Sequence, residues 1–320
     1  MTPKIVFLDS ATIAPSISVR RPSFAHEWQS FEKTAPEQVV ERLQGATIAV
    51  SNKVVITADM LAQLPALKLI AVAATGYNII DLAACKAQGV AACNIRGYAT
   101  NTVPEHTFAM ILALRRNLVE YRQQVIDGEW VRSEQFCFFN RPILDLAGSN
   151  LGIIGAGILG QSVGRIAQAF GMNVMYLNQH IRQAPDHGEV VSLEQFRDEV
   201  DVLTLHCPLT DETKNIIDAD FLSGMKNTAL VINTGRGGLV NEQALADAIR
   251  SGSIAGAGID VTEQEPAPLD SPIMQIADLP QVLLTPHVAW ASEGAMQTLA
   301  DQLIDNIEAF ERGEPRNLLG

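Results

Sequence analysis

The sequence has 320 residues, 47% hydrophobic and 18% charged, which is typical of a folded globular protein and long for a single core. Its 23 Lys and Arg residues against 36 Asp and Glu residues give a net charge of −13, which repels phosphate backbones and anionic membrane surfaces. We therefore expect two domains, exclude nucleic acid and membranes as partners, and expect an anionic ligand to need a local positive charge.

The N-terminus and the cysteines point to a cytoplasmic protein. Lys4 precedes a short strand-like IVFL run, with no long apolar stretch or cleavage site, and no run reaches the length of a membrane span. The four cysteines are scattered without a CxxC pair, which favours reduced thiols and indicates no metal site.

The first hundred residues alternate strands with helices. Strands are expected at 4–8, 47–50 and 69–74, and helices at 36–44 and 58–64. This alternation predicts parallel pairing with right-handed crossovers, and ligands gather at the carboxyl ends of such strands.

Two of these strand ends carry polar residues. Asn52 and Lys53 follow the second strand and are either substrate contacts or an ordinary solvated loop. Thr75 and Gly76 follow the third strand, where a glycine exposes backbone N–H groups that can hold a carboxylate. We expect Asn52, Thr75 and Gly76 to contact the substrate.

A long apolar helix is expected over 103–118, with a proline in its first turn. A helix that is apolar nearly all round is buried, either between domains or against a second subunit. We interpret His106, in its first turn, as a core or interface histidine rather than a catalytic one. Residues 130–141 show no clear period and are expected to wrap around the surface.

Residues 151–171 are typical of a buried strand, a GxGxxG turn and a helix, the turn containing Gly155, Gly157 and Gly160. The first glycine permits the tight turn, the second lets backbone approach a pyrophosphate, and the third lets the helix pack closely on the strand. The phosphates then lie on N–H groups at the helix N-terminus, beside Ile158 and Leu159. The alternative is that these glycines serve packing only.

Five more strands are expected, at 173–177, 202–205, 229–233, 254–259 and 282–284. Further dinucleotide contacts are expected at or after their ends, from Asn178, Cys207, Pro208, Thr213, Thr234, Gly235 and Asp260. Asp260 either holds a nicotinamide carboxamide or caps a loop. A long amphipathic helix over 294–310 can return to the first domain.

Hydride transfer between a nicotinamide and a carbon bearing oxygen needs a proton carrier, a cation for an acid substrate, and a group that orients the proton carrier. His287 is the best base, because it directly follows a strand and precedes small residues, and His206 is its competitor. Arg236 either reaches a carboxylate with its fork or closes a surface turn. Glu265 either pairs with His287 or belongs to a solvated acidic run.

Six segments in this order are similar to the signatures of the D-2-hydroxyacid dehydrogenase family: ATGYNIID, NTVPEHTFAMILALRRN, GAGILG, INTGRGGLVNE, GIDVTEQEP and TPHVAWAS. Trp290, after the HVA of the last segment, resembles the glycerate dehydrogenase, or hydroxypyruvate reductase, branch.

The resemblance implies an α/β protein with two Rossmann-like, doubly wound parallel-sheet domains. Residues 1–100 and 288–320 would form a discontinuous, flavodoxin-like substrate domain, and residues 101–287 the dinucleotide-binding domain. The resemblance also implies a homodimer built on the helix after Val103.

The resemblance further implies a role for each candidate residue. Arg236 would bind the substrate carboxylate and carbonyl, Glu265 would pair with His287, and His287 would be the acid/base. The backbone at Thr75 and Gly76 would bind the carboxylate, and Trp290 would contact the substrate.

The end of the second strand of the nucleotide fold departs from the commoner family pattern. Asn178 replaces the acidic residue that grips the adenosine ribose, Gln179 and His180 follow, and Arg182 is nearby, so nothing repels a 2′-phosphate. We expect NAD(H) to be used and NADP(H) to be accepted.

The expected function is hydride transfer between NAD(P)H and a small 2-oxo or 2-hydroxy acid, foremost hydroxypyruvate and D-glycerate. Glyoxylate or another 2-oxo acid is the alternative substrate. A dinucleotide-sensing interaction protein on the same fold is the alternative class, and the joint presence of Arg236, Glu265 and His287 favours the enzyme.

Overall fold

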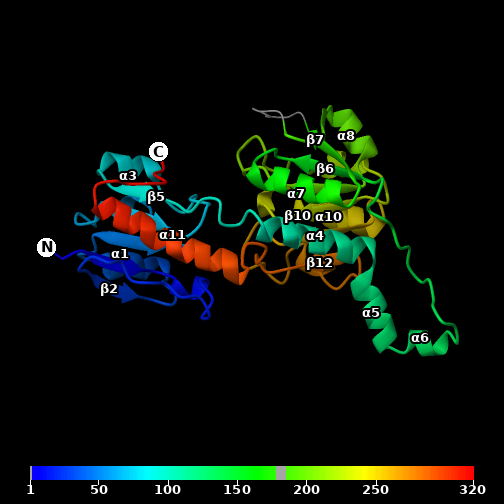
Figure 1. Cartoon of the computed structure of the whole chain (residues 1–320), viewed down its shortest axis with the longest axis horizontal. Helices are drawn as coiled ribbons and strands as arrows, with labels where there is room; N and C mark the ends of the chain where they lie inside the picture. The colour runs from blue at the N-terminus through cyan, green and yellow to red at the C-terminus, as the bar shows by residue number, and fades with distance from the viewer. Residues whose placement is uncertain (1, 178–184) are drawn as a thin grey trace. The chain divides into compact units, whose positions relative to one another are not determined.

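The computed structural model describes residues 2–177 and 185–320 and divides into two compact units (Figure 1). The first unit comprises Met1–Tyr98 and Ala291–Gly320, and the second comprises Ala99–Trp290. The boundaries expected from the sequence were 100/101 and 287/288. No helix in the described ranges is both long and apolar enough to cross a lipid bilayer.

The first unit is built on a five-stranded parallel sheet with the order β2-β1-β3-β4-β5. This is the flavodoxin-like order, in which the chain switches direction across the sheet between β1 and β3. Two of its strands were not predicted, because β2 has a polar sequence at the sheet edge and β5 is very short. The strands are β1 Lys4–Phe7, β2 Glu27–Ser30, β3 Ile48–Ser51, β4 Leu69–Val72 and β5 Ala91–Cys93.

Helices cover both faces of this sheet. One apolar core lies under the short helices, where Val6 and Val72 meet Val39 and Leu61. The long C-terminal helix α11 packs against β4 of the same sheet, as Figure 1 shows. The helices are α1 Val39–Leu43, α2 Ala58–Leu61, α3 Leu82–Ala87 and α11 Glu293–Glu311, with short 3₁₀ turns at Ser10–Thr12 and Pro36–Gln38.

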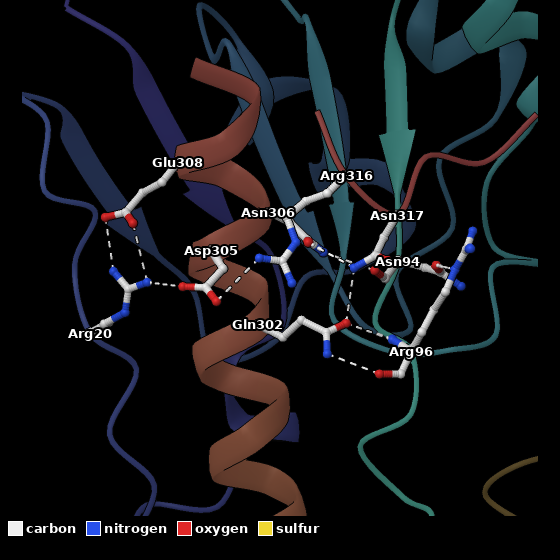
Figure 2. Close-up of polar contacts among 9 residues, drawn as sticks. All are labelled: Arg20, Asn94, Arg96, Gln302, Asp305, Asn306, Glu308, Arg316 and Asn317. Atoms are coloured by element: carbon white, nitrogen blue, oxygen red, sulfur yellow. Dashed lines mark hydrogen bonds and ion pairs between the residues drawn. The ribbon is translucent and has the colours of Figure 1, made fainter. Parts of the chain in front are cut away.

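Polar side chains also fasten α11 to the N-terminal part of the chain (Figure 2). Arg20 bonds both Asp305, at 2.5 Å, and Glu308, at 3.0 Å. On another side of the helix, the buried Asn306 donates through Nδ2 to the carbonyl of Asn94 at 2.9 Å. Its Oδ1 accepts from Asn317 at 3.0 Å. The last thirty residues therefore belong physically to the first unit.

Replacing Glu308 by Gln is expected to lower the free energy of unfolding of the first unit by about 1 kcal/mol at neutral pH. The Arg20 hydrogen bonds lower the pKa of Glu308 from its usual 4.5 to about 2. The stabilisation is therefore complete above pH 4.5 and is lost as the pH falls toward 2. Urea unfolding should show a smaller difference between wild type and variant at about pH 3 than at pH 7. An unchanged difference would contradict this, and Glu311→Gln on the same helix is the control.

The second unit is built on a seven-stranded parallel sheet with the order β12-β11-β10-β9-β6-β7-β8. Counted from β6, this is the Rossmann order 3-2-1-4-5-6 with a seventh strand added. The two sheets confirm the predicted fold class. The strands are β6 Asn150–Ile154, β7 Asn173–Leu177, β8 Glu189–Val191, β9 Val202–Leu205, β10 Leu230–Asn233, β11 Gly256–Ile259 and β12 Val282–Leu284.

Side chains along the strands of this sheet point alternately into two apolar cores, one on each face. Leu151 and Ile153 face the core shared with α4 and α7, whereas Ile154 faces the core shared with α8, α9 and α10. Most of α4, including Phe108 and Ile111, is thus covered inside its own unit. The helices are α4 Thr102–Arg115, α7 Ile158–Ala169, α8 Leu193–Glu199, α9 Ala219–Ser223 and α10 Glu242–Ser251.

The chain beyond α4 forms an arm that extends away from the rest of the second unit (Figure 1). The predicted helix over 103–118 ends at Arg115, because Asn117 takes a left-handed conformation with φ of 50°. The arm then contains α5 Leu118–Ile126 and α6 Glu129–Arg132. The expectation that 130–141 wraps around the surface is wrong: this segment projects, and Val131 and Phe136 are more than four-fifths exposed.

Candidate active site

Five strand ends of the second unit deliver residues to one edge of the sheet. Because β6, β9, β10, β11 and β12 are all parallel, the residues that follow them lie along the same carboxyl edge. These residues are Gly155, His206, Thr234, Asp260 and Thr285. All but Thr285 were singled out from the sequence.

The three glycines of the turn after β6 have three different surroundings. Gly155 has φ of 107°, and a Cβ there would lie 2.5 Å from the backbone carbon of His206. A Cβ on Gly160 would lie 2.0 Å from the carbonyl oxygen of Gly155, so only glycine lets α7 approach the strand this closely. A Cβ on Gly157 would meet no atom within 4 Å. Two glycines are therefore required by packing, and Gly157 is not.

The surroundings of Gly157 fit a dinucleotide. Gly157 is the N-cap of α7, whose first N–H groups have no partner within the helix and form the positive end of its dipole. The neighbouring Ile158 is 68% exposed and Leu159 is partly buried. An open, glycine-lined helix N-terminus is a site for a pyrophosphate.

The loop after β9 lies beside this turn. Thr213 donates to the carbonyl of Pro208 at 2.7 Å and accepts from the N–H of Thr210 at 2.8 Å. Thr213 thus shapes the loop of Cys207 and Pro208 through its hydroxyl. Burial raises the pKa of the Cys207 thiol to about 11, so this side chain is uncharged at neutral pH.

His206, the competing base, is unsuited to carry a proton at neutral pH. Burial lowers its pKa to about 4, and its Nε2 pairs with the hydroxyl of Thr204 at 3.0 Å. A histidine that remains neutral at pH 7 cannot donate a proton from an imidazolium. This leaves His287 as the better candidate.

The turn that carries Arg236 is clamped by Asn233, the last residue of β10. Asn233 accepts from the N–H of Gly235 at 3.0 Å and donates to the carbonyl of Arg236 at 2.8 Å. The Arg236 guanidinium donates from Nη1 to the carbonyl of Gly235 at 2.7 Å. The hydroxyl of the preceding Thr234 pairs with that of Thr107 on α4 at 3.1 Å. The arginine therefore stands on a rigid turn.

Gly237 brings the turn of Arg236 against the loop of Glu265. A Cβ on Gly237 would lie 1.9 Å from the backbone carbon of Thr262. Thr262 in turn donates its N–H to Oε1 of Glu265 at 3.2 Å. Gly237 was not predicted as a site residue, although it stands in a run of glycines around the arginine.

Glu265 and His287 form the expected pair. Oε2 of Glu265 lies 2.6 Å from Nδ1 of His287. Because an ionised carboxylate only accepts hydrogen bonds, the contact assigns a proton to Nδ1 and leaves Nε2 as the ring nitrogen outside this pair. Of the two interpretations of Glu265, the contact supports pairing with His287 over membership of a solvated acidic run.

Asp260 caps the loop that contains His287. Its carboxylate accepts from the hydroxyl of Thr285 at 2.6 Å and from the N–H groups of Val288 and Ala289, both at 2.9 Å. Its carbonyl accepts from the N–H of His287 at 2.8 Å. Asp260 was expected either to hold a nicotinamide carboxamide or to cap a loop, and these contacts are those of a loop cap. Trp290 completes the loop by donating from Nε1 to the carbonyl of His287 at 2.9 Å.

Three predicted substrate contacts lie in the first unit. The buried Asp9 accepts from the N–H groups of Asn52, at 2.9 Å, and Lys53, at 2.6 Å. Thr75 is tied through its hydroxyl to the carbonyl of Ile95 at 2.8 Å, whereas no backbone hydrogen bond from the N–H of Thr75 or Gly76 is found within the described ranges. Hydrogen bonds thus fix the conformation of the loop after each of these two strands.

Asp9 is a residue that the sequence analysis missed. Burial raises the pKa of its carboxyl, and the N–H groups of Asn52 and Lys53 oppose that shift. Its position directly after an apolar run was the available signal. Asn178, the residue on which the choice between NAD and NADP was argued, lies outside the described residues.

Comparison with known proteins covers both units. Residues 108–289 match the family model described as D-isomer specific 2-hydroxyacid dehydrogenase, NAD binding domain. The glycerate dehydrogenase of Methylorubrum extorquens is 53% identical over 320 residues, which are 100% of this chain and 99% of that protein. The hydroxypyruvate reductase of Blautia hydrogenotrophica is 34% identical over 288 residues, 89% of this chain and 88% of that protein.

A solved structure is similar to this chain along its whole length. It is the crystal structure of an NADPH-dependent glyoxylate/hydroxypyruvate reductase from Sinorhizobium meliloti in complex with NADP and malonate. It aligns with a TM-score of 0.85 at 28% identity, covering 100% of this chain and 97% of that one.

Proposed function

The chain belongs to the D-isomer-specific 2-hydroxyacid dehydrogenase family, and from this premise we propose that it interconverts hydroxypyruvate and D-glycerate with a nicotinamide cofactor. The observation that carries the proposal is the Glu265–His287 pair on the same sheet edge as the glycine turn and Arg236. The similarity to a glycerate dehydrogenase and a hydroxypyruvate reductase supports the choice of substrate.

Reduction of the substrate carbonyl needs a hydride at C2 and a proton at the oxygen. The bound nicotinamide supplies or accepts the hydride. Protonated His287 donates from Nε2 to the developing alkoxide, and in the reverse direction neutral Nε2 takes the hydroxyl proton. Glu265 holds the ring in the tautomer that this transfer requires and stabilises the imidazolium.

The substrate carboxylate is proposed to bind Arg236, whose guanidinium matches a carboxylate in shape and charge. Backbone N–H groups at Thr75 and Gly76 are proposed as its other ligands, with Asn52 and Trp290 as further substrate contacts. A protein with net charge −13 repels an anion at long range, so this local arginine offsets the field.

The cofactor is proposed to lie on the N-terminus of α7, over Gly155, Gly157 and Gly160, and along the loops of Pro208, Thr234 and Asp260. We propose that NADP(H) is accepted beside NAD(H), because the sequence has Asn178 where the commoner family pattern has an acidic residue. Paired kinetics with NADH and NADPH test this, and strong exclusion of NADPH would contradict it.

Replacing Gly157 by Ala is expected to leave the fold intact and to weaken cofactor binding about tenfold, because the new methyl group stands where a pyrophosphate must approach. Fluorescence titration with NADH and a thermal melt measure the two effects separately. A variant with normal NADH affinity would place the pyrophosphate elsewhere.

The proposed function is tested by mixing the purified protein with NADH and following the loss of nicotinamide absorbance on adding hydroxypyruvate, glyoxylate or other 2-oxo acids. Hydroxypyruvate is expected to give the highest kcat/KM. Binding of NADH without turnover of any 2-oxo acid would favour the dinucleotide-sensing alternative.

We also propose a homodimer, assembled through the arm of residues 117–143. The arm exposes Val131, Phe136 and Phe139, each at least 80% accessible, more apolar surface than isolated residues usually show. A cavity of about 250 Å³ at its base, lined in part by Leu114 and Pro142, offers room for a side chain of a second copy. Most of α4 is buried within its own unit. We therefore propose the dimer interface at the arm and not along α4.

Replacing both Phe136 and Phe139 by Ser is expected to convert the dimer into a monomer in sedimentation velocity, because two large apolar contacts are lost. Leu269→Ser changes an exposed apolar residue elsewhere in the same unit. It is the matched control and should leave the assembly unchanged. Dimers in both variants would exclude this surface as the dimer interface.

A cytoplasmic location is also proposed, which suits four free thiols.

A further inference from the structure

The first two turns of α4 make polar contacts with the edge that carries the proposed chemistry. Thr102 donates to the carbonyl of Ala289 at 3.0 Å, and Thr107 pairs with Thr234 at 3.1 Å. Between them, Nε2 of His106 lies 3.1 Å from the hydroxyl oxygen of Thr285. A helix selected only for its apolar surface would not place three polar side chains on the two loops that follow β10 and β12.

The direction of the hydrogen bonds through Thr285 can be assigned. A hydroxyl has one proton, and that of Thr285 goes to the Asp260 carboxylate, which lies 2.6 Å away and only accepts. The hydroxyl oxygen therefore accepts from His106, whose Nε2 must carry a proton. The same Nε2 lies 3.7 Å from Asp260, so its positive edge faces a buried carboxylate.

The chain of contacts continues from Asp260 to both sides of His287. The Asp260 carboxylate holds the N–H groups of Val288 and Ala289, and its carbonyl holds the N–H of His287. His287 has φ of 55°, in the left-handed region that is unfavourable for residues other than glycine. These backbone bonds keep it there, and Glu265 holds only the ring.

We propose that His106 is a positioning residue for proton transfer: acting through Thr285 and Asp260, it holds the backbone of His287 so that Nε2 faces the substrate oxygen. The inference rests on the proposed role of His287. It changes the interpretation of His106 from a core or interface histidine to part of the catalytic apparatus. The class of effect is orientation, because His106 contacts neither Glu265 nor His287 in any described interaction.

Four variants test this: His106→Leu, His106→Gln, Thr285→Val and the double variant His106→Leu/Thr285→Val. Removing either contact is expected to lower kcat about tenfold while the Kd for NADH stays within about twofold, because the ring is misaligned rather than absent. Gln retains an N–H donor and should restore most of the rate. Since both residues act through one chain, the double variant should be little worse than either single one.

A second measurement does not depend on turnover. Hydrogen exchange at the Val288 and Ala289 amides, without substrate, should be faster in His106→Leu and Thr285→Val than in wild type, and near wild type in His106→Gln. His26→Leu, whose ring in wild type hydrogen-bonds the carbonyl of Phe24 in the first unit, is the matched control for kcat.

The outcomes separate two failures. Unchanged amide exchange in His106→Leu would overturn the inference, as would a double variant whose loss is the product of the single losses. A wild-type protein that reduces no 2-oxo acid would contradict the proposed function instead, whatever the exchange rates show.

Discussion

Replacing His287 by Ala is expected to lower kcat for 2-oxo acid reduction by about a thousandfold, within the range that a positioned acid or base contributes. The carbonyl oxygen would then have to take its proton from water. Affinity for NADH should stay nearly unchanged, because the glycine turn and α7 are built without His287. Steady-state kinetics and fluorescence titration measure the two quantities. Turnover close to that of wild type would show that another group carries the proton.

Glu265→Gln provides the graded comparison. An amide still hydrogen-bonds Nδ1 but does not stabilise the imidazolium, so we expect a loss of about tenfold to a hundredfold in kcat. Glu263→Gln, two residues earlier and exposed, is the matched control and should leave kcat unchanged. Equal losses in both variants would mean that the 2.6 Å contact between Glu265 and His287 is not functional.

Replacing Arg236 by Leu is expected to raise KM for hydroxypyruvate by about a hundredfold to a thousandfold, because two charge-assisted hydrogen bonds to the carboxylate are lost. Arg236→Lys retains the charge without the fork and should lose about tenfold. Since Asn233 clamps the turn through two hydrogen bonds that do not involve the guanidinium, both variants should fold normally.

Two controls sharpen the test of Arg236. Arg250→Leu removes an exposed arginine of α10 in the same unit and should leave KM unchanged. The Kd for NADH should be the same in all three variants. An Arg236→Leu variant with normal KM would remove this residue from the substrate site and leave the carboxylate to another cation.

Much of the nucleotide fold was predictable because its signals are local. A buried parallel strand is a short apolar run, and the glycines after β6 follow directly from the tight turn and the close helix packing seen at Gly155 and Gly160. The polar strand β2 and the arm after Asn117 were not predicted. Neither segment has a repeating pattern of apolar residues that marks a buried face.

The sequence by itself determined which residues stand after each strand, and hence that Arg236, Asp260 and His287 share an edge of the sheet. Parallel pairing follows from the alternation of strands and helices along the chain, whereas the order of the strands is seen only in the structure. The tertiary structure alone decided that Glu265 meets His287, that Asp260 caps a loop, that His206 stays neutral and that α4 is covered in its own unit. The physical reason is that burial, protonation and hydrogen-bond partners depend on groups far apart in the chain, and only folding brings them together.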